Sequence, residues 1–169
     1  PACSTGEEAY SLAILFKEAI EQIKPAKNIS LQIFATDLDQ HAIEKAREGI
    51  FPANIAADVS AKRLDRYFLK VDRGYEITKS IREMVIFAQQ NIIMDPPFTK
   101  LDLISCRNLL IYLKPSAQQR VLETFGVMLE PEVVIWKREK GHDVTREEAV
   151  ERLAAANQEA ADKGALARG

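Results

Sequence analysis

A short polar turn at the start of the chain leads into a stretch with helical hydrophobic spacing. Ser4 with Glu7, or Thr5 with Glu8, has the spacing of a capping box, which favours a helix start. We expect this helix to end near Pro25 and to bury one apolar face, composed of Leu12, Phe16, Ala19, Ile20 and Ile23. Because the first residues already read as a loop entering a helix, we expect the chain to begin inside a domain.

Apolar runs of strand length alternate with helical patterns along the rest of the chain. Residues 31–35 predict a buried strand that stops at an acidic turn, where Asp39 is placed to cap a helix over residues 40–48 that Gly49 closes. Ser60 is placed to cap a helix that runs through Phe68 and buries Leu64 and Phe68. Further strands are predicted at residues 74–77, 84–88, 101–105 and 133–136.

Two more helices are predicted towards the carboxyl terminus. Pro115 suits the first turn of a helix that buries Val121, Leu122, Phe125 and Met128. Thr145 and Glu148 form another capping-box match, which opens an alanine-rich helix ending near Gly164.

The alternation predicts an α/β fold, a mainly parallel sheet with helices on both faces. Ligands bind such sheets at the carboxyl ends of the strands. The polar residues expected at that rim are those of the turn at residues 4–8 together with Asp37, Asp39, Asn91, Arg107 and Asn108.

Composition narrows the choice of partners and compartments. The chain has 169 residues, of which 47% are hydrophobic, so it can bury one domain core, and its net charge of -2 gives no global attraction to nucleic acid. No apolar run approaches the ~20 residues that span a bilayer, and no secretion signal opens the sequence. Cys3 and Cys106 suggest neither a disulfide framework nor a metal site, and with His41 and His142 they form no catalytic triad, so we expect a reduced cytoplasmic protein.

Asp37 is the strongest single candidate for ligand binding. An acid just past a strand of a nucleotide-type sheet can accept hydrogen bonds from both hydroxyls of a ribose. The alternative is a turn residue or helix cap, but Asp39 is better placed as the cap.

Two other clusters leave their roles open. The small residues Ala2, Cys3, Ser4 and Gly6 would let backbone approach a ligand, with Glu8 supplying charge, yet plain helix capping is the better explanation when the turn is taken alone. Arg107 and Asn108 could bind a carboxylate, order a loop or form a surface turn.

Residues 95–98, Asp-Pro-Pro-Phe, resemble the motif of amino-group methyltransferases that act on adenine or glutamine. In those enzymes the motif directly follows a strand, whereas here the clearest predicted strand, at residues 101–105, comes after it. We therefore interpret it as a connecting turn.

Three motifs together resemble the chemotaxis receptor glutamate O-methyltransferase (CheR-type) family. They are residues 2–11, ACSTGEEAYS, residues 35–39, ATDLD, and residues 105–112, SCRNLLIY. The similarity runs from about residue 2 to Phe125, and residues 87–104 look most like the branch that is fused to methylesterase and sensor domains.

This resemblance implies an incomplete class I, Rossmann-like methyltransferase fold that binds S-adenosylmethionine and releases S-adenosylhomocysteine. By motif, Glu8 and Asp37 would hold the cofactor, and Asn91 and Ile92 would flank the adenine. The cofactor and substrate pocket would be lined by Arg107, Asn108 and Tyr112. The implied reaction is attack of a receptor glutamate oxygen on the methyl carbon, which needs no general base because the carboxylate is already ionised.

The chain also departs from the family. The resemblance places an N-terminal helical domain, its active-site linker and a central first strand before Pro1, and a Gly-Gly turn and a further strand after Phe125. We therefore divide the chain into a partial methyltransferase domain at residues 1–129 and a divergent strand and helical tail at residues 130–169, and we predict weak or no turnover. The alternatives are a non-catalytic cofactor-binding scaffold in signalling and an amino-group methyltransferase acting on nucleic acid or glutamine.

Overall fold

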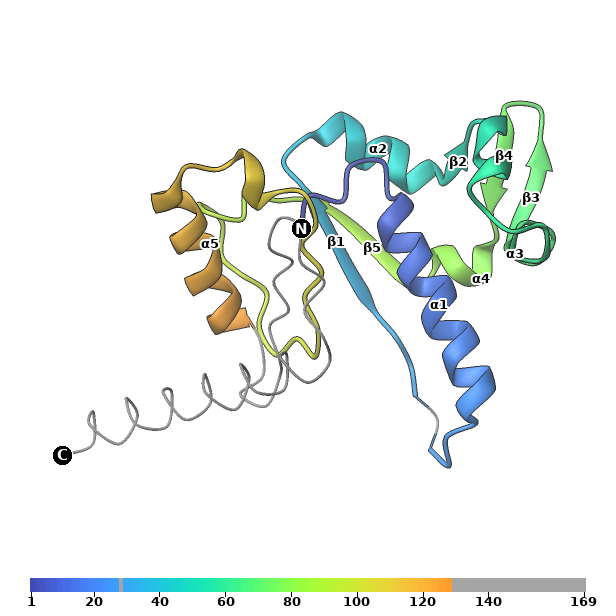
Figure 1. Ribbon diagram of the computed structural model, residues 1–169, viewed down its shortest axis with the longest axis horizontal. Helices are drawn as coiled ribbons and strands as arrows, with labels where there is room; N and C mark the ends of the chain where they lie inside the picture. The colour runs from blue at the N-terminus through green and yellow to red at the C-terminus, as the bar shows by residue number, and fades with distance from the viewer. Residues whose placement is uncertain (28, 129–169) are drawn as a thin grey trace. The chain divides into compact units, whose positions relative to one another are not determined.

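The computed structural model describes residues 1–27 and 29–128 (Figure 1). Residues 1–97 and 105–124 form one compact unit, whereas residues 98–104 and 125–128 belong to a second unit. The predicted strand at residues 133–136, the helix from Thr145 and the domain boundary at residue 129 lie outside the described residues. No described helix has both the length and the apolar character needed to cross a membrane.

Two parallel strands form the sheet on which the first unit is built. β1 (Ile33–Asp37) pairs with β5 (Val85–Gln89) in register, from Ile33 opposite Val85 to Asp37 opposite Gln89. The predicted strands at residues 31–35 and 84–88 are thus confirmed within two residues. Alternation along the strands buries Ala35, Val85 and Phe87 and turns Phe34 and Ile86 outward, at 40% and 47% exposure.

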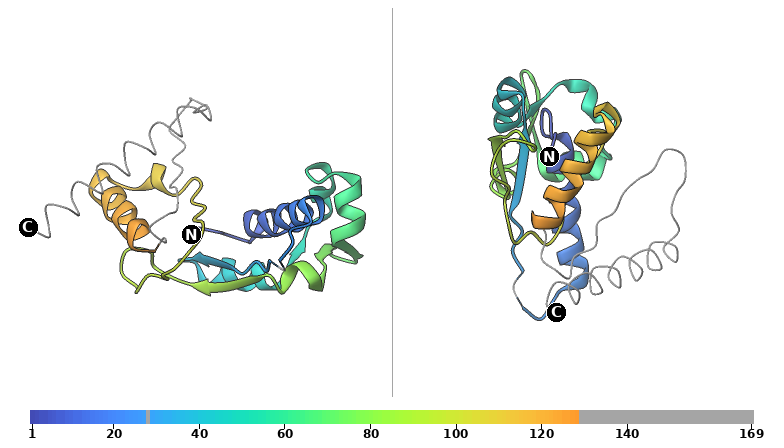
Figure 2. Two further views of the ribbon diagram at one scale, coloured as in Figure 1. Left: turned by 90° about the horizontal axis from the view of Figure 1, so that it is seen from below. Right: turned by 90° about the vertical axis from the view of Figure 1, so that its left-hand side faces the viewer.

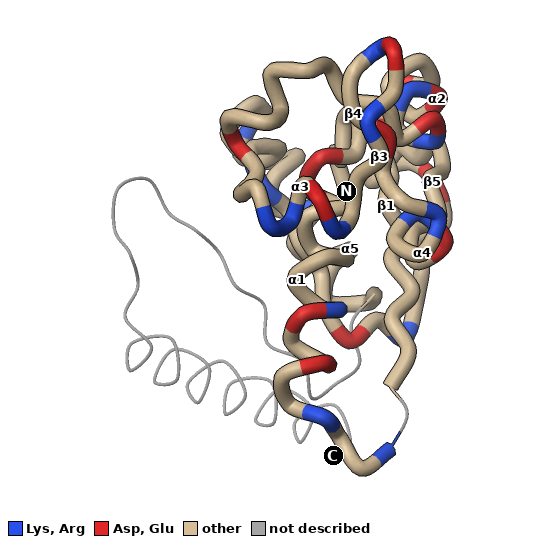
Figure 3. The backbone as a smooth tube through the Cα atoms, turned by 90° about the vertical axis from the view of Figure 1, so that its right-hand side faces the viewer, with Lys and Arg blue, Asp and Glu red and all other residues tan. Residues whose placement is uncertain are grey.

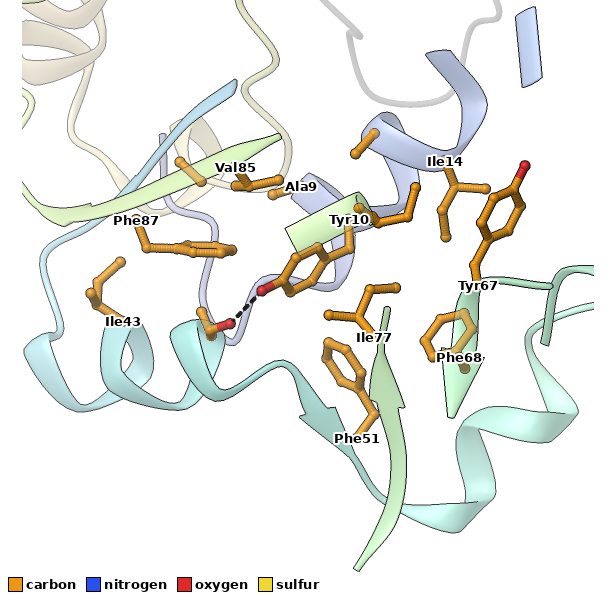
Figure 4. Close-up of a cluster of buried hydrophobic side chains, with 14 residues drawn as sticks. Ala9, Tyr10, Ile14, Ile43, Phe51, Tyr67, Phe68, Ile77, Val85 and Phe87 are labelled. Atoms are coloured by element: carbon orange, nitrogen blue, oxygen red, sulfur yellow. Dashed lines mark hydrogen bonds between the residues drawn. The ribbon is translucent and has the colours of Figure 1, made fainter. Parts of the chain in front are cut away.

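Helices α1 (Glu7–Ile23) and α2 (Gln40–Glu48) pack together on the buried face of this sheet. Figure 4 shows Phe87 lying between Ile43 of α2 and Tyr10 of α1, and the Tyr10 hydroxyl donates to the Ala46 carbonyl at 2.9 Å. This hydrogen bond links α1 directly to α2.

The buried face of α1 differs from the predicted one. Its buried residues are Ala9, Tyr10, Ala13 and Ile14, whereas Ile23 of the predicted face is 70% exposed. The alanines bring the helix backbone close to the strands and the Tyr10 hydroxyl finds a carbonyl partner, so local packing outweighs the larger apolar stripe.

The ends of α2 follow the prediction, and the start of α1 does not. The Asp39 carboxylate accepts from the His41 N–H at 2.8 Å, and Gly49 closes α2 with a φ of 64°. The N-cap of α1 is instead Gly6, with a φ of 91° and no side-chain cap. The Thr5 hydroxyl donates to the Glu7 carboxylate, and Ser4 is bonded to Asp37 through its backbone N–H.

A second, antiparallel sheet packs against α1 through Phe51, whose ring lies 6.0 Å from that of Tyr10. Its strand order is β2 (Ile50–Phe51), β4 (Gly74–Ile77), β3 (Phe68–Val71). The connections are the 3-10 helix η1 (Ala53–Ala57), α3 (Ala61–Tyr67) and α4 (Lys79–Arg82). Ser60 caps α3 as predicted, accepting from the Arg63 N–H at 3.4 Å, while Tyr67 is more deeply buried than Leu64.

The predicted strand at residues 101–105 does not form. Leu101 makes only an isolated bridge, and its N–H donates to the Met128 carbonyl at 3.0 Å. A parallel strand needs a neighbour for its hydrogen bonds, and the described residues supply none for this segment.

Beyond it lie the 3-10 helix η2 (Leu110–Tyr112) and α5 (Pro115–Met128), the helix predicted from Pro115. Val121, Phe125 and Met128 are buried as expected, and Leu122 is half-buried.

Candidate functional site

The opening turn of the chain is bonded to the carboxyl end of β1. The Cys3 N–H donates to the Thr36 carbonyl at 3.0 Å, and the Ser4 N–H donates to Asp37 Oδ2 at 2.8 Å. Ala2, Ser4 and Gly6 all have positive φ, which winds the turn tightly across the strand end (Figure 2).

Asp37 is held by backbone groups on both sides. Its Oδ1 accepts from the Asp39 N–H at 3.0 Å while Oδ2 accepts from Ser4. Each carboxylate oxygen has two acceptor positions, so the half-buried Asp37 can still accept from a hydroxyl. The predicted cap is confirmed, because Asp39 caps α2, whereas the ligand role of Asp37 stays a prediction.

Gly6 is required by packing within the protein. A Cβ at this position would lie 3.0 Å from the Phe87 ring and 3.1 Å from the Ala46 Cβ. The predicted reason for small residues in the turn, close approach to a ligand, therefore does not account for Gly6, whose neighbours are β5 and α2.

Glu8 joins the opening turn to the corner that contains Arg107 and Asn108. The Ser105 hydroxyl donates a short hydrogen bond to Glu8 Oε1, across 97 positions of sequence. Asn108 has a φ of 60°, so the chain turns sharply just after Cys106 and Arg107. Sequence reasoning missed Ser105, although a hydroxyl at the end of an apolar run was a usable signal.

Three predicted site residues of this corner have exposed side chains. Arg107, Asn108 and Tyr112 form no side-chain hydrogen bond or ion pair with any described residue, and Tyr112 is 81% exposed. They are therefore available to an incoming ligand, and the structure does not orient them in advance.

A turn after β5 completes the rim next to Asp37. The Gln90 N–H donates to the Asp37 carbonyl at 2.9 Å, which places the next residue, Asn91, beside the end of β1. Asn91 Oδ1 accepts from the N–H groups of Ile93 and Met94 at 3.0 and 3.3 Å, and the Asn91 N–H donates to Asp95 Oδ2 at 2.7 Å.

Asp95 thus closes this turn, as the interpretation of residues 95–98 as a connection predicted. The strand position used in that argument was wrong, because residues 101–105 form no strand. The nearest preceding strand is β5, which ends six positions before Asp95, at Gln89.

Both thiols near this rim are poor nucleophiles at neutral pH. Burial, followed by the nearby Asp37 carboxylate, raises the pKa of Cys3 to about 11. Burial is also the main cause that raises the pKa of Cys106. Among the described residues no cluster of three or more histidine, cysteine and acidic side chains is arranged to hold a metal ion.

The residues at the rim fit a nucleoside that carries an amino-acid tail. A carboxylate with spare acceptor positions lies at Asp37, and a buried amide oxygen without a hydrogen-bond donor lies at Gln90. Glu8 lies at the start of α1 and Arg107 two positions after Ser105, so both signs of charge are available to a zwitterionic tail.

Comparison with known proteins agrees with this geometry. Residues 1–139 match the family described as "CheR methyltransferase, SAM binding domain". A "Chemotaxis protein methyltransferase 2" of Vibrio cholerae is 33% identical over 138 residues, which cover 79% of this chain and 47% of that protein. The "Chemotaxis protein methyltransferase" of Salmonella typhimurium is 31% identical over 144 residues, covering 80% of this chain and 48% of that protein.

A third relative is much longer. It is the "Uncharacterized 104.1 kDa protein in hypE 3'region" of Rhodobacter capsulatus, 47% identical over 120 residues, which cover 71% of this chain and 12% of that protein. The chain thus spans about half the length of the chemotaxis methyltransferases and a small part of this one. It belongs to the CheR methyltransferase family, and the part matched is that family's S-adenosylmethionine-binding domain.

Proposed function

We propose that the chain binds S-adenosylmethionine where β1 ends and serves methyl transfer to glutamate carboxylates of chemotaxis receptors. The observation that carries this proposal is the double attachment of the opening turn. Ser4 bonds to Asp37, and Glu8 accepts from Ser105 beside Arg107 and Asn108. Relatives named as chemotaxis protein methyltransferases support the same reaction class.

Each rim residue has a role that suits its environment. Asp37, fixed by two backbone N–H groups, accepts from ribose hydroxyls, and Glu8 contributes to holding the cofactor. Asn91 and Ile92, at the turn after β5, flank the adenine. The exposed side chains of Arg107, Asn108 and Tyr112 complete the cofactor and substrate pocket.

The reaction requires the protein to align the carboxylate with the methyl group, and it does not require proton transfer. When bound, S-adenosylmethionine supplies a methyl group already activated by its sulfonium. A glutamate carboxylate is ionised at neutral pH, so no residue of this rim has to act as a base. Arg107 can orient such a carboxylate through paired N–H groups, which is the positioning that the transfer requires.

The length of the chain bears on its turnover. Because it spans about half of the related methyltransferases, we propose that it binds the cofactor but transfers methyl groups weakly or not at all when alone. The 104.1 kDa relative supports a parent protein with additional domains, of which methylesterase and sensor domains are our proposal. The free thiols of Cys3 and Cys106 are consistent with a cytoplasmic site of action.

Isothermal titration calorimetry of the 169-residue chain with S-adenosylhomocysteine tests the binding claim. Saturable one-to-one binding is expected. A folded sample that gives no binding heat at millimolar ligand would remove the proposal.

A methyl-transfer assay with receptor and radiolabelled S-adenosylmethionine then separates an enzyme from the second candidate, a non-catalytic binding module, which the partial length favours. Binding without transfer would identify the module, and efficient transfer would show that the remaining half of the family sequence is dispensable. The amino-group methyltransferase alternative loses support, since its acidic residue, Asp95, is bonded to the Asn91 N–H.

A further inference from the structure

Gln90 directly follows β5, and the oxygen of its buried side-chain amide has no hydrogen-bond donor among the described residues. Gln90 is only 9% exposed, and its Nε2 donates to the Pro96 carbonyl at 3.1 Å. Its Oε1 accepts from no group in the described part of the chain. Buried acceptors are nearly always paired in folded proteins, so one that is left open at a binding rim needs a functional explanation.

The orientation of this amide is fixed by its surroundings. A carbonyl oxygen can only accept, so the Gln90 side chain must present its NH2 group to Pro96. Turning the amide over would bring two acceptor oxygens together. The oxygen therefore lies on the side away from Pro96, where it has no hydrogen-bond donor among the described residues.

Gln90 belongs to the same rim as Asp37. Its backbone N–H donates to the Asp37 carbonyl at 2.9 Å, and it directly precedes Asn91. Two other side-chain oxygens of this turn already accept hydrogen bonds within it. Asn91 Oδ1 accepts from Ile93 and Met94, and Asp95 Oδ2 accepts from the Asn91 N–H.

We propose that Gln90 Oε1 accepts a hydrogen bond from the 6-amino group of the adenine ring, which makes Gln90 a specificity-determining residue. The inference rests on the proposed function, because it assumes the adenine lies at this turn. Adenine carries a donor at its 6 position, and Gln90 Oε1 is a buried acceptor at this turn that has no donor among the described residues.

The oxygen is shielded from water in this structure. Admission of the amino group therefore requires a small displacement of the residues that cover it, and that displacement is part of the proposal.

Two ligands titrated into two proteins test this assignment. The ligands are S-adenosylhomocysteine and its 6-deamino analogue, which carries hydrogen in place of the amino group. Wild-type chain is expected to bind the first about tenfold more tightly, the effect of one hydrogen bond to an otherwise unpaired acceptor. Gln90→Met is expected to bring the two affinities within about twofold of each other.

The ratio of the affinities for the two ligands distinguishes recognition of the amino group from a structural effect of the substitution. Loss of the Pro96 bond would weaken both ligands alike and leave the ratio unchanged. The control is Gln89→Met, which removes the neighbouring exposed amide and its 2.9 Å bond to the Leu38 carbonyl, and it should keep the tenfold preference.

Each outcome is decisive. Equal affinity of the wild-type chain for both ligands overturns the assignment without recourse to any variant, and so does a full preference retained by a folded Gln90→Met. Either result leaves the proposed function standing. Failure of the wild-type chain to bind either ligand overturns both proposals together.

Discussion

Asp37 is the residue on which the proposed cofactor site depends most. Its carboxylate bonds to the opening turn through Ser4 and to its own turn through Asp39, so the protein fixes its position before any ligand arrives. Preorganisation of this kind lowers the entropy lost on binding.

Asp37→Asn should weaken binding of S-adenosylhomocysteine by about tenfold or more, because a neutral amide offers one acceptor oxygen where the carboxylate offers two. Calorimetric titration of the variant measures this loss. Asp65→Asn makes the same substitution at an exposed position of α3, and this variant should bind the ligand like the wild-type chain. An unchanged affinity in folded Asp37→Asn would contradict the role assigned to Asp37.

Cys3 offers a chemical probe of the same turn. With a pKa of about 11, only about one thiol in a thousand is ionised at pH 8, so iodoacetamide should label Cys3 far more slowly in the native chain than in urea. Asp37 contributes to raising that pKa, so Asp37→Asn should speed the labelling. Peptide mapping by mass spectrometry follows Cys3 separately from Cys106, and native labelling as fast as in urea would show that the turn is not held as described.

At the scale of elements, α2 is bounded by two residues that act for different reasons. Asp39 satisfies a backbone N–H at its start, and Gly49 adopts a left-handed conformation at its end. Gly49 is also enclosed, since a Cβ there would lie 2.6 Å from Ile77 Cγ2.

Gly49→Ala should therefore lower the free energy of unfolding by about 2 kcal/mol or more, from the left-handed conformation and the steric overlap together. Gly126→Ala is the matched control, because Gly126 lies within α5 and, outside its own helical backbone, no atom of the described residues lies within 4 Å of the added methyl. It should raise stability by about 0.5–1 kcal/mol, as alanine replaces glycine in a helix. Equal effects in urea unfolding would contradict the packing around Gly49.

Elements defined by local signals were predictable, and those defined by neighbours were not. Asp39 and Gly49 mark the ends of α2 within the sequence itself, and the apolar run before Asp37 is long enough to be read as a strand. The buried face of α1 was missed because Ala9 and Ala13 are weak hydrophobic signals that matter only once the strands are in place.

The prediction of a strand at residues 101–105 was wrong for the opposite reason. Its sequence favours a strand, but strand pairing depends on a neighbour that local pattern cannot supply.

The same limit applies to the site. The position of Asp37 after a strand suggested its ligand role, which stays a prediction, and the Asp39 cap followed from spacing. Ser105 and Gln90 were not found, because their importance lies in a contact across 97 positions and in a missing partner, neither of which leaves a local pattern.

At the scale of the first unit, ion pairs tie α1 to the α3 segment of the antiparallel sheet. Glu18 bonds to Arg63 and Glu21 to Arg66, each at 2.6 Å. Figure 3 shows acidic and basic positions interspersed along the described chain, so neither sign of charge dominates.

The pH dependence of stability should report the Glu18 pair. The hydrogen bond from Arg63 is the main cause that lowers the pKa of Glu18 below 4.5. A lowered pKa means that the pair stabilises the fold above the ordinary glutamate pKa and that this contribution is lost as the pH falls through the folded value. The urea midpoint of the wild-type chain should therefore exceed that of Glu18→Gln at pH 7, and the difference should narrow as the pH falls towards 3.

Glu83→Gln provides the comparison, since Glu83 pairs with Lys79 at 3.5 Å with both side chains mostly exposed. It should change the urea midpoint little at either pH. A gap for Glu18→Gln that persists unchanged at pH 3 would contradict the ionic link between α1 and α3.

The central claim is that four stretches, far apart in the sequence, form one binding rim. The most direct measurement is a pair of ¹H–¹⁵N correlation spectra of the labelled chain, recorded without and with S-adenosylhomocysteine. The account predicts shifts for amides of residues 3–8, 37–39, 90–92 and 105–108 together, while those of α3 stay in place. Shifts confined to one of these stretches, or no shifts at all in a folded sample, would contradict it.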